Sequence, residues 1–212
     1  MHQVYSQVAK LLTIVSCFYG HVVRKTKIIP EQEKTVVINK YFYFTHLCLT
    51  ATIILLVLSF FRAVHTSSIY KFLLPIIIMY ELFIIMIFWS LFFISPTLII
   101  SKAGAQKENF SHLVNLCQHL FPIVGLSILF FETQMNHDYR RYGFISFFLA
   151  VYTQMMKYNK KHKGNFPYGF LDKMSDMQVT FIFYPCTFFI KCLLLYFIVS
   201  LNDKIMIGRL RK

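Results

Sequence analysis

Residues 70–94 read YKFLLPIIIMYELFIIMIFWSLFFI, a run in which only Lys71 and Glu81 carry charge. An α-helix rises about 1.5 Å per residue, so a helix of this length spans the roughly 30 Å hydrocarbon core of a bilayer. We therefore predict a transmembrane helix over this run.

Five further apolar runs flank this span. Measured against the roughly 17 to 25 residues that a crossing helix needs, they predict spans at about 5–23, 41–61, 113–131, 142–157 and 179–201. The run at 142–157 is close to the minimum length, so five spans is the alternative count. No linker, repeat or low-complexity segment divides the chain. The sequence predicts an all-α, multi-pass transmembrane helix bundle of about six spans, with residues 1–212 forming a single integral-membrane domain.

The composition agrees with a bilayer as the main solvent. Hydrophobic residues make up 57% of the chain and charged residues 15%, against about 25% charged in an average soluble protein. The net charge of +13 would suggest nucleic acid as a partner of a soluble protein. Here Lys71 and Lys157 fall at the ends of predicted spans, and only Lys10 and Lys191, of all the basic residues, fall in their interior. Basic loops contact lipid headgroups, so we expect membrane lipids as partners and no nucleic acid.

The orientation in the membrane stays open. The first span has no small-residue cleavage site, so we interpret it as a retained helix. Six spans place both ends of the chain on one face, here called face A, and the loops after spans one, three and five on face B. Basic residues are more numerous on face B, which favours a cytosolic face B, whereas the glycosylation sequon Asn109-Phe110-Ser111 favours the opposite. We expect a multi-pass integral membrane protein, with endomembrane or plasma membrane undetermined.

Signatures of several membrane-enzyme classes are absent from the sequence. It contains no G-x-S-x-G, no H-E-x-x-H, no Gly-rich phosphate loop and no cluster of closely spaced histidine pairs. The five cysteines all fall inside predicted spans without a C-x-x-C pair, so we interpret them as small buried apolar side chains. Haem ligation by His46 and His119 is an alternative, but we expect neither metal nor cofactor.

Two polar residues interrupt apolar runs near the face-B ends of different spans. Thr45 lies about four residues into the second span and His119 about six residues into the fourth, which puts both side chains roughly 6 to 10 Å below the interface. A hydroxyl beside a neutral imidazole is the minimum equipment for acyl transfer to water. We predict Thr45 as the nucleophile and His119 as its general base. The alternative is that both residues only pack, with Thr45 bonding a carbonyl of its own helix.

Neighbouring polar residues extend this site. Asn115 lies four residues before His119 and so on the same helical face, where it can hold the ring or line an oxyanion site. His46 points about 100° away from Thr45 around the helix, which makes it the weaker base candidate.

Four further polar residues are candidates for functional or structural roles: two lie in the loop before the last span and two lie inside spans. Tyr168 and Asp172 belong to the face-B loop over the predicted pocket. Asp172 either orients His119 or has a solvated or capping role. Glu81 and Lys191 lie near the middle of the third and sixth spans, and we expect them to pair because an unpaired charge there is costly.

Taken in order along the chain, these residues resemble the androgen-induced gene family of integral-membrane threonine hydrolases. The resemblance covers about 41–201 and rests on Thr45, Phe88-Trp89, Asn115-x-x-x-His119, Glu132 followed by His137-x-Tyr139, and Gly164-x-x-x-Tyr168-Gly169-Phe170-Leu171-Asp172. It implies a carboxylic ester hydrolase that cleaves lipid esters, notably fatty acid esters of hydroxy fatty acids, without a cofactor. Carried over by position, Thr45 is the nucleophile and His119 the base. The alternative is a non-catalytic multi-pass membrane protein, such as a transporter or an assembly factor.

Overall fold

The structure is a computed structural model of the chain, and it describes residues 2–26, 44–95, 98, 112–163, 166, 168 and 170–210. The described residues form helices and no strand. The helices are α1 (His2–Thr26), α3 (Phe44–Leu58), α4 (Arg62–His65), α5 (Ser68–Ile94), α7 (His112–His119), α8 (Phe121–Glu132), α9 (Arg140–Lys163), α10 (Asp176–Gln178) and α11 (Tyr184–Leu210). A 3₁₀ turn at Leu171–Lys173 precedes α10, and a π-helical turn at Val179–Phe183 joins α10 to α11.

Within the described residues the predicted spans fall on helices, except that Leu120 forms a turn between α7 and α8 and that α3 ends at Leu58, three residues before the predicted end of the second span. Ser68–Ile94, Leu113–Glu132 and Asp176–Arg209 are long and apolar enough to cross a membrane, and α3 is a shorter apolar helix. The more polar helices α1 and α9 are not in this set. The predicted all-α, multi-pass bundle is confirmed, whereas the count of six spans stays a prediction.

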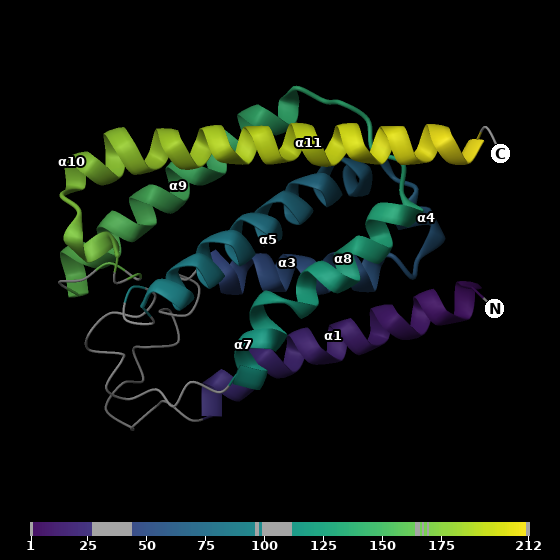
Figure 1. Cartoon of the computed structure of the whole chain (residues 1–212), viewed down its shortest axis with the longest axis horizontal. Coiled ribbons are helices and arrows are strands. Elements are labelled where there is room, and N and C mark those ends of the chain that lie inside the picture. Colours follow the sequence, from purple (N-terminus) through teal and green to yellow (C-terminus); the bar gives the residue numbers. More distant parts are fainter. Residues whose placement is uncertain are drawn as a thin grey trace.

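Helix α5 occupies the middle of the bundle. It contacts α3, α7 and α8 as well as α9 and α11, and α1 packs against α3, α7 and α8. Figure 1 shows α1 and α11 at opposite edges of the view, with α3 and α5 between them. The N-terminal end of α1 and the C-terminal end of α11 lie at the same end of the bundle, which is the arrangement that an even number of crossings gives.

The outer surface of α11 is apolar. Phe189, Leu193 and Phe197 follow one another at intervals of four residues and are exposed, while Leu195 and Ile198 on another face of the helix are buried. Residues four apart share a helical face, and a water-facing stripe would carry polar residues. This stripe therefore fits contact with acyl chains.

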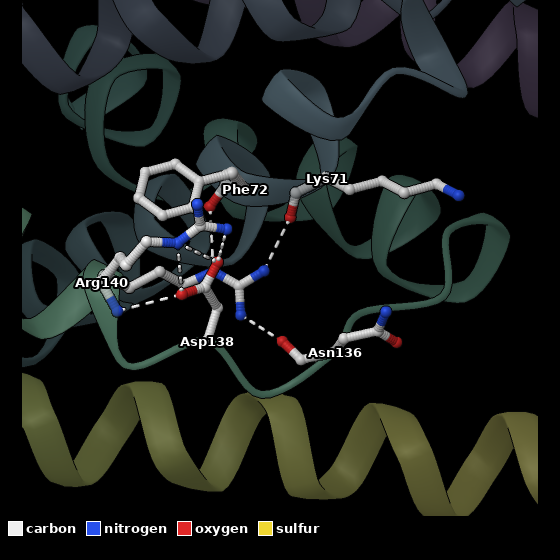
Figure 2. Close-up of polar contacts among 6 residues, drawn as sticks. Lys71, Phe72, Asn136, Asp138 and Arg140 are labelled. Atoms are coloured by element: carbon white, nitrogen blue, oxygen red, sulfur yellow. Dashed lines mark hydrogen bonds and ion pairs between the residues drawn. The ribbon is translucent and has the colours of Figure 1, made fainter.

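A single arginine ties α9 to α5. Pro75 lies inside α5 and lacks the N–H that would bond to the carbonyl of Lys71, four residues earlier. Arg141 supplies a donor there: its Nη2 donates to Lys71 O at 3.0 Å. The same guanidinium donates through Nε to Phe72 O at 3.1 Å and through Nη1 to Asn136 O. Figure 2 shows the Lys71 and Asn136 carbonyls converging on this guanidinium.

Helix α1 is joined to α8 by an ion pair, and the two helices lie in close contact at Gly125. Lys10 Nζ lies 2.6 Å from Glu132 Oε2, so this lysine within a predicted span is paired. Further along the same helices, a Cβ placed on Gly125 would lie only 2.5 Å from Thr13 Cγ2. The missing side chain at Gly125 allows the two helices to approach closely, as small residues do at helix contacts in membranes.

Acid pH is expected to destabilise the fold through His65 of α4. Its Nε2 is hydrogen-bonded to Thr133 Oγ1 at 2.9 Å. Burial, and then the charge of Lys10, lower the pKa of His65, so the folded protein favours the neutral ring. The unfolded chain then binds more protons below about pH 6.5, and stability falls as the pH drops through that value.

The melting temperature of the detergent-solubilised protein measures this effect. Between about pH 7.5 and about pH 5.5, where histidine titrates, it should fall further for the wild type than for His65→Gln. The exposed His137 offers the control, since His137→Gln should behave as the wild type does. An equal fall in the wild type and His65→Gln would contradict the prediction.

The five cysteines are free thiols. Cys17, Cys48 and Cys117 are buried, as predicted, whereas Cys192 is half-buried and Cys186 is exposed. The interpretation as buried apolar side chains is therefore correct for three of them, and Cys186 departs from it because it lies on an outward face of α11.

Candidate active site

Thr45 lies in the first turn of α3, where the helix N-terminus is held by two tyrosines. The backbone N–H of Phe44 donates to Tyr168 Oη at 2.9 Å and to Tyr152 Oη at 3.0 Å. Backbone N–H groups of a first helical turn have no partner within the helix, and here side chains from α9 and from the loop after it provide one. The side chain of Thr45 is half-buried, so it is partly accessible next to this anchored end.

His119 is the last residue of α7 and is buried. Its ring stacks on that of Phe88 from α5, with centroids 3.5 Å apart and planes at 18°. The helix breaks directly after it: Leu120 forms a turn, and Pro122 in the first turn of α8 has no backbone N–H to continue the bonds of α7. The Phe88-Trp89 motif and the His119 motif, which are far apart in sequence, therefore meet in the fold.

Helices α3 and α7, which carry Thr45 and His119, contact each other, and both contact α5. The structure thus brings the two helices together, while contact between the two side chains stays a prediction. Asn115 lies one turn before His119, and its Nδ2 is buried without a hydrogen-bond partner among the described residues. An unused buried donor beside the predicted general base would be suited to stabilising an oxyanion.

His46, which follows Thr45 in sequence, contacts His21 of α1. His46 Nδ1 lies 3.4 Å from Nδ1 of His21 in α1, and the two rings meet edge to face with centroids 5.3 Å apart. Within the described part of the chain, no group of three or more His, Cys, Asp or Glu side chains could hold a metal ion.

The two loop residues predicted to lie over the pocket have different contacts. Tyr168 reaches the N-terminus of α3 through its bond with Phe44, which places it beside the predicted nucleophile. Asp172 is exposed, and its Oδ1 accepts from the backbone N–H of Phe166 at 2.7 Å. This bond stabilises the loop that carries Tyr168.

The predicted ion pair between Glu81 and Lys191 is wrong. Glu81 Oε1 instead accepts from Thr52 Oγ1 at 2.8 Å, and Oε2 has no hydrogen-bond partner among the described residues. The Lys191 ammonium lies over aromatic rings, 4.5 Å from the ring centroid of Phe83. Both side chains are buried. Glu81 is bonded to the hydroxyl of Thr52 where Lys191 was expected, and Lys191 lies against an aromatic ring where Glu81 was expected.

The residues predicted from the sequence did not include Thr52, which bonds Glu81, or Tyr152, which bonds Phe44 next to Thr45. The signal that could have identified Thr52 is its spacing, because it follows Thr45 by seven residues and so shares its helical face. Tyr152 interrupts an apolar run, but the residue it bonds, Phe44, is 108 positions away. No local spacing rule connects residues so distant.

Comparison with known proteins gives one match. The family model described as FAR-17a/AIG1-like protein matches residues 7–203. No curated protein sequence and no solved structure matches the chain.

Proposed function

The chain belongs to the FAR-17a/AIG1-like family, and from this we propose that it is a membrane-embedded hydrolase of lipid esters, with Thr45 as nucleophile and His119 as general base. The observation that carries the proposal is that Thr45 and His119, each expected from a family motif, lie on helices that contact each other and share α5 as a neighbour. The substrate class implied by the family is the fatty acid esters of hydroxy fatty acids.

In the proposed reaction His119 accepts the proton of the Thr45 hydroxyl as Oγ1 attacks the ester carbonyl carbon. The tetrahedral intermediate places a negative charge on the former carbonyl oxygen, and Nδ2 of Asn115 donates to it. The intermediate collapses to an acyl-threonine, and the leaving alkoxide takes the proton from His119. Water then attacks the acyl-threonine while His119 removes its proton. The second tetrahedral intermediate collapses to the fatty acid, and Oγ1 of Thr45 takes the proton back from His119.

The surroundings suit a lipid substrate. Acyl chains can reach the site sideways from the bilayer, because the bundle carries apolar side chains on its outer face. Two buried aromatic residues adjoin the proposed catalytic residues: Phe44 immediately precedes Thr45, and Phe88 stacks on the ring of His119. The reaction as written needs no metal and no organic cofactor.

Labelling with a fluorophosphonate probe tests the proposal. The wild-type protein in detergent should become covalently labelled, while Thr45→Ala and His119→Ala should not. Thr50→Ala is the matched control, because Thr50 is a half-buried threonine of the same helix whose hydroxyl donates to the carbonyl of His46. Labelling of Thr45→Ala equal to that of the wild type would reject Thr45 as nucleophile and favour a non-catalytic membrane protein.

A further inference from the structure

Lys191 of α11 lies in an aromatic cluster without an anionic partner. Its side chain is 2% exposed, and Nζ lies 4.5, 5.0 and 5.1 Å from the ring centroids of Phe83, Phe44 and Tyr80. Among the described residues no carboxylate pairs with it and no oxygen accepts a hydrogen bond from it. Ring faces attract an ammonium, but they leave its three N–H donors without acceptors.

The hydroxyl of Tyr80 is a second unused donor in the same cluster. Tyr80 is buried, and its Oη has no hydrogen-bond partner among the described residues. A buried polar group left unpaired destabilises the fold, so two such groups together need an explanation. An ammonium and a phenol hydroxyl are both donors, and a group that accepts from both satisfies them.

No carboxylate of the described chain fills this role. Glu81 follows Tyr80 in sequence, but its side chain leaves α5 about 100° further round the helix, and its Oε1 is taken by Thr52. The missing acceptor therefore has to come from a bound molecule. A carboxylate fits this donor pair best, because it offers two oxygens and one negative charge, and charge-assisted hydrogen bonds to it are the strong ones.

The cluster adjoins the proposed active site and the lipid. Phe44, whose ring lies under the Lys191 ammonium, immediately precedes Thr45. On α11, Ile190 directly before Lys191 and Leu193 two residues after it are exposed on the outer surface of the bundle. An anionic lipid in the bilayer thus has a short path to the cluster.

We propose that Lys191 and Tyr80 bind the free carboxylate of the lipid substrate, so that the protein selects esters carrying an acid group over neutral esters. This inference rests on the proposed hydrolase function. Binding of the acid end of the substrate at Lys191 would hold its ester bond near Thr45. The energy of that binding would then help to orient the ester carbonyl carbon for attack by the Thr45 hydroxyl.

The test compares two substrates that differ only in this group, a fatty acid ester of hydroxystearic acid and the methyl ester of the same compound. The wild type should hydrolyse the free acid with a kcat/KM at least about tenfold higher, which is the size of one charge-assisted hydrogen bond. Lys191→Met should lower the free-acid kcat/KM by at least about tenfold, so that the ratio of the free-acid value to the methyl-ester value falls to about one. Tyr80→Phe should lose a smaller part of the preference.

Lys204→Met, an exposed lysine of the same helix, is the matched control and should keep the full preference. Equal rates of the wild type on the two esters, or an equal loss on both in Lys191→Met, would overturn the inference. Crosslinking of a photoreactive fatty acid and of its methyl ester separates this failure from that of the proposed function. If the wild type hydrolyses neither ester, the hydrolase proposal fails. In that case, crosslinking of the fatty acid but not of its methyl ester, lost in Lys191→Met, still supports the carboxylate site. If the wild type does not capture the acid in this way, the carboxylate site is rejected.

Discussion

Replacing Arg141 with methionine is expected to lower the free energy of unfolding by about 3 kcal/mol or more. The substitution keeps a side chain of similar length but removes all the donors, leaving the carbonyls of Lys71, Phe72 and Asn136 without their guanidinium partner. Lys71 and Phe72 are half-buried, and a carbonyl shielded from water that loses its partner costs about 1–3 kcal/mol. The Lys71 carbonyl is the most affected, because Pro75 cannot replace the lost bond.

Unfolding of the purified protein by increasing mole fractions of a denaturing detergent measures this loss. Arg140→Met is the matched control: Arg140 is the adjacent residue, is exposed, and pairs only with Asp138 beside it (Figure 2), and such surface pairs contribute about 0–1 kcal/mol. Arg141→Lys should fall between the two, since one ammonium cannot present the planar fork that reaches three separate carbonyls. Equal stability of Arg141→Met and Arg140→Met would show that the fork does not hold α9 to α5.

The helical architecture could be predicted because it depends on short-range properties. Apolar runs long enough to span a bilayer indicate a helix irrespective of the rest of the chain, and Ser68–Ile94 is such a run. The candidates Thr45 and His119 could also be predicted, because a hydroxyl and an imidazole are unusual among apolar neighbours. Their helices are neighbours in the fold, which similar depth in the membrane alone did not require.

The partners of buried polar groups could not be predicted in the same way. Opposite charges at mid-span suggested that Glu81 binds Lys191, but rotation of each helix decides which side chains meet, and hydropathy carries no information on rotation. The observed partner of Glu81, Thr52, is 29 positions away on another helix. The two tyrosine hydroxyls at the N-terminus of α3 depend in the same way on how α9 packs, which the sequence of α9 alone does not specify.

The polar side chains near Thr45 have distinct tasks in this arrangement. Tyr152 and Tyr168 hold the backbone of α3 through Phe44, and Asp172 holds the loop that carries Tyr168. These contacts fix the position of Thr45 without taking up its hydroxyl. A nucleophile works best on a rigid element supported by surrounding residues, so the geometry is consistent with the role proposed for Thr45.

Gly125→Ala is expected to destabilise the contact between α1 and α8 by about 2–3 kcal/mol, the upper part of the range for overpacking a filled interface. The new Cβ would lie 2.5 Å from Thr13 Cγ2, 2.9 Å from Thr13 Cβ and 3.0 Å from Thr13 Oγ1, distances at which the two helices have to move apart. Gly143→Ala in α9 is the matched control, because nothing lies within 4 Å of a Cβ placed there. An alanine at that position should be neutral or slightly stabilising, since glycine in a helix is unfavourable.

A second substitution shows whether the clash is the cause. Thr13→Ala removes Cγ2 and Oγ1, two of the three atoms that the new methyl group meets. By itself it gives up the packing of one buried methyl group and a hydrogen bond to Ala9 O within its own helix. The double variant should therefore recover most of the stability lost in Gly125→Ala, with a coupling of more than about 1 kcal/mol. The reactivity of Cys17 reports the same event, because this buried thiol lies one turn beyond Thr13 on α1 and becomes accessible when α1 moves away. If the two losses simply add, the helices are not in direct contact at Gly125.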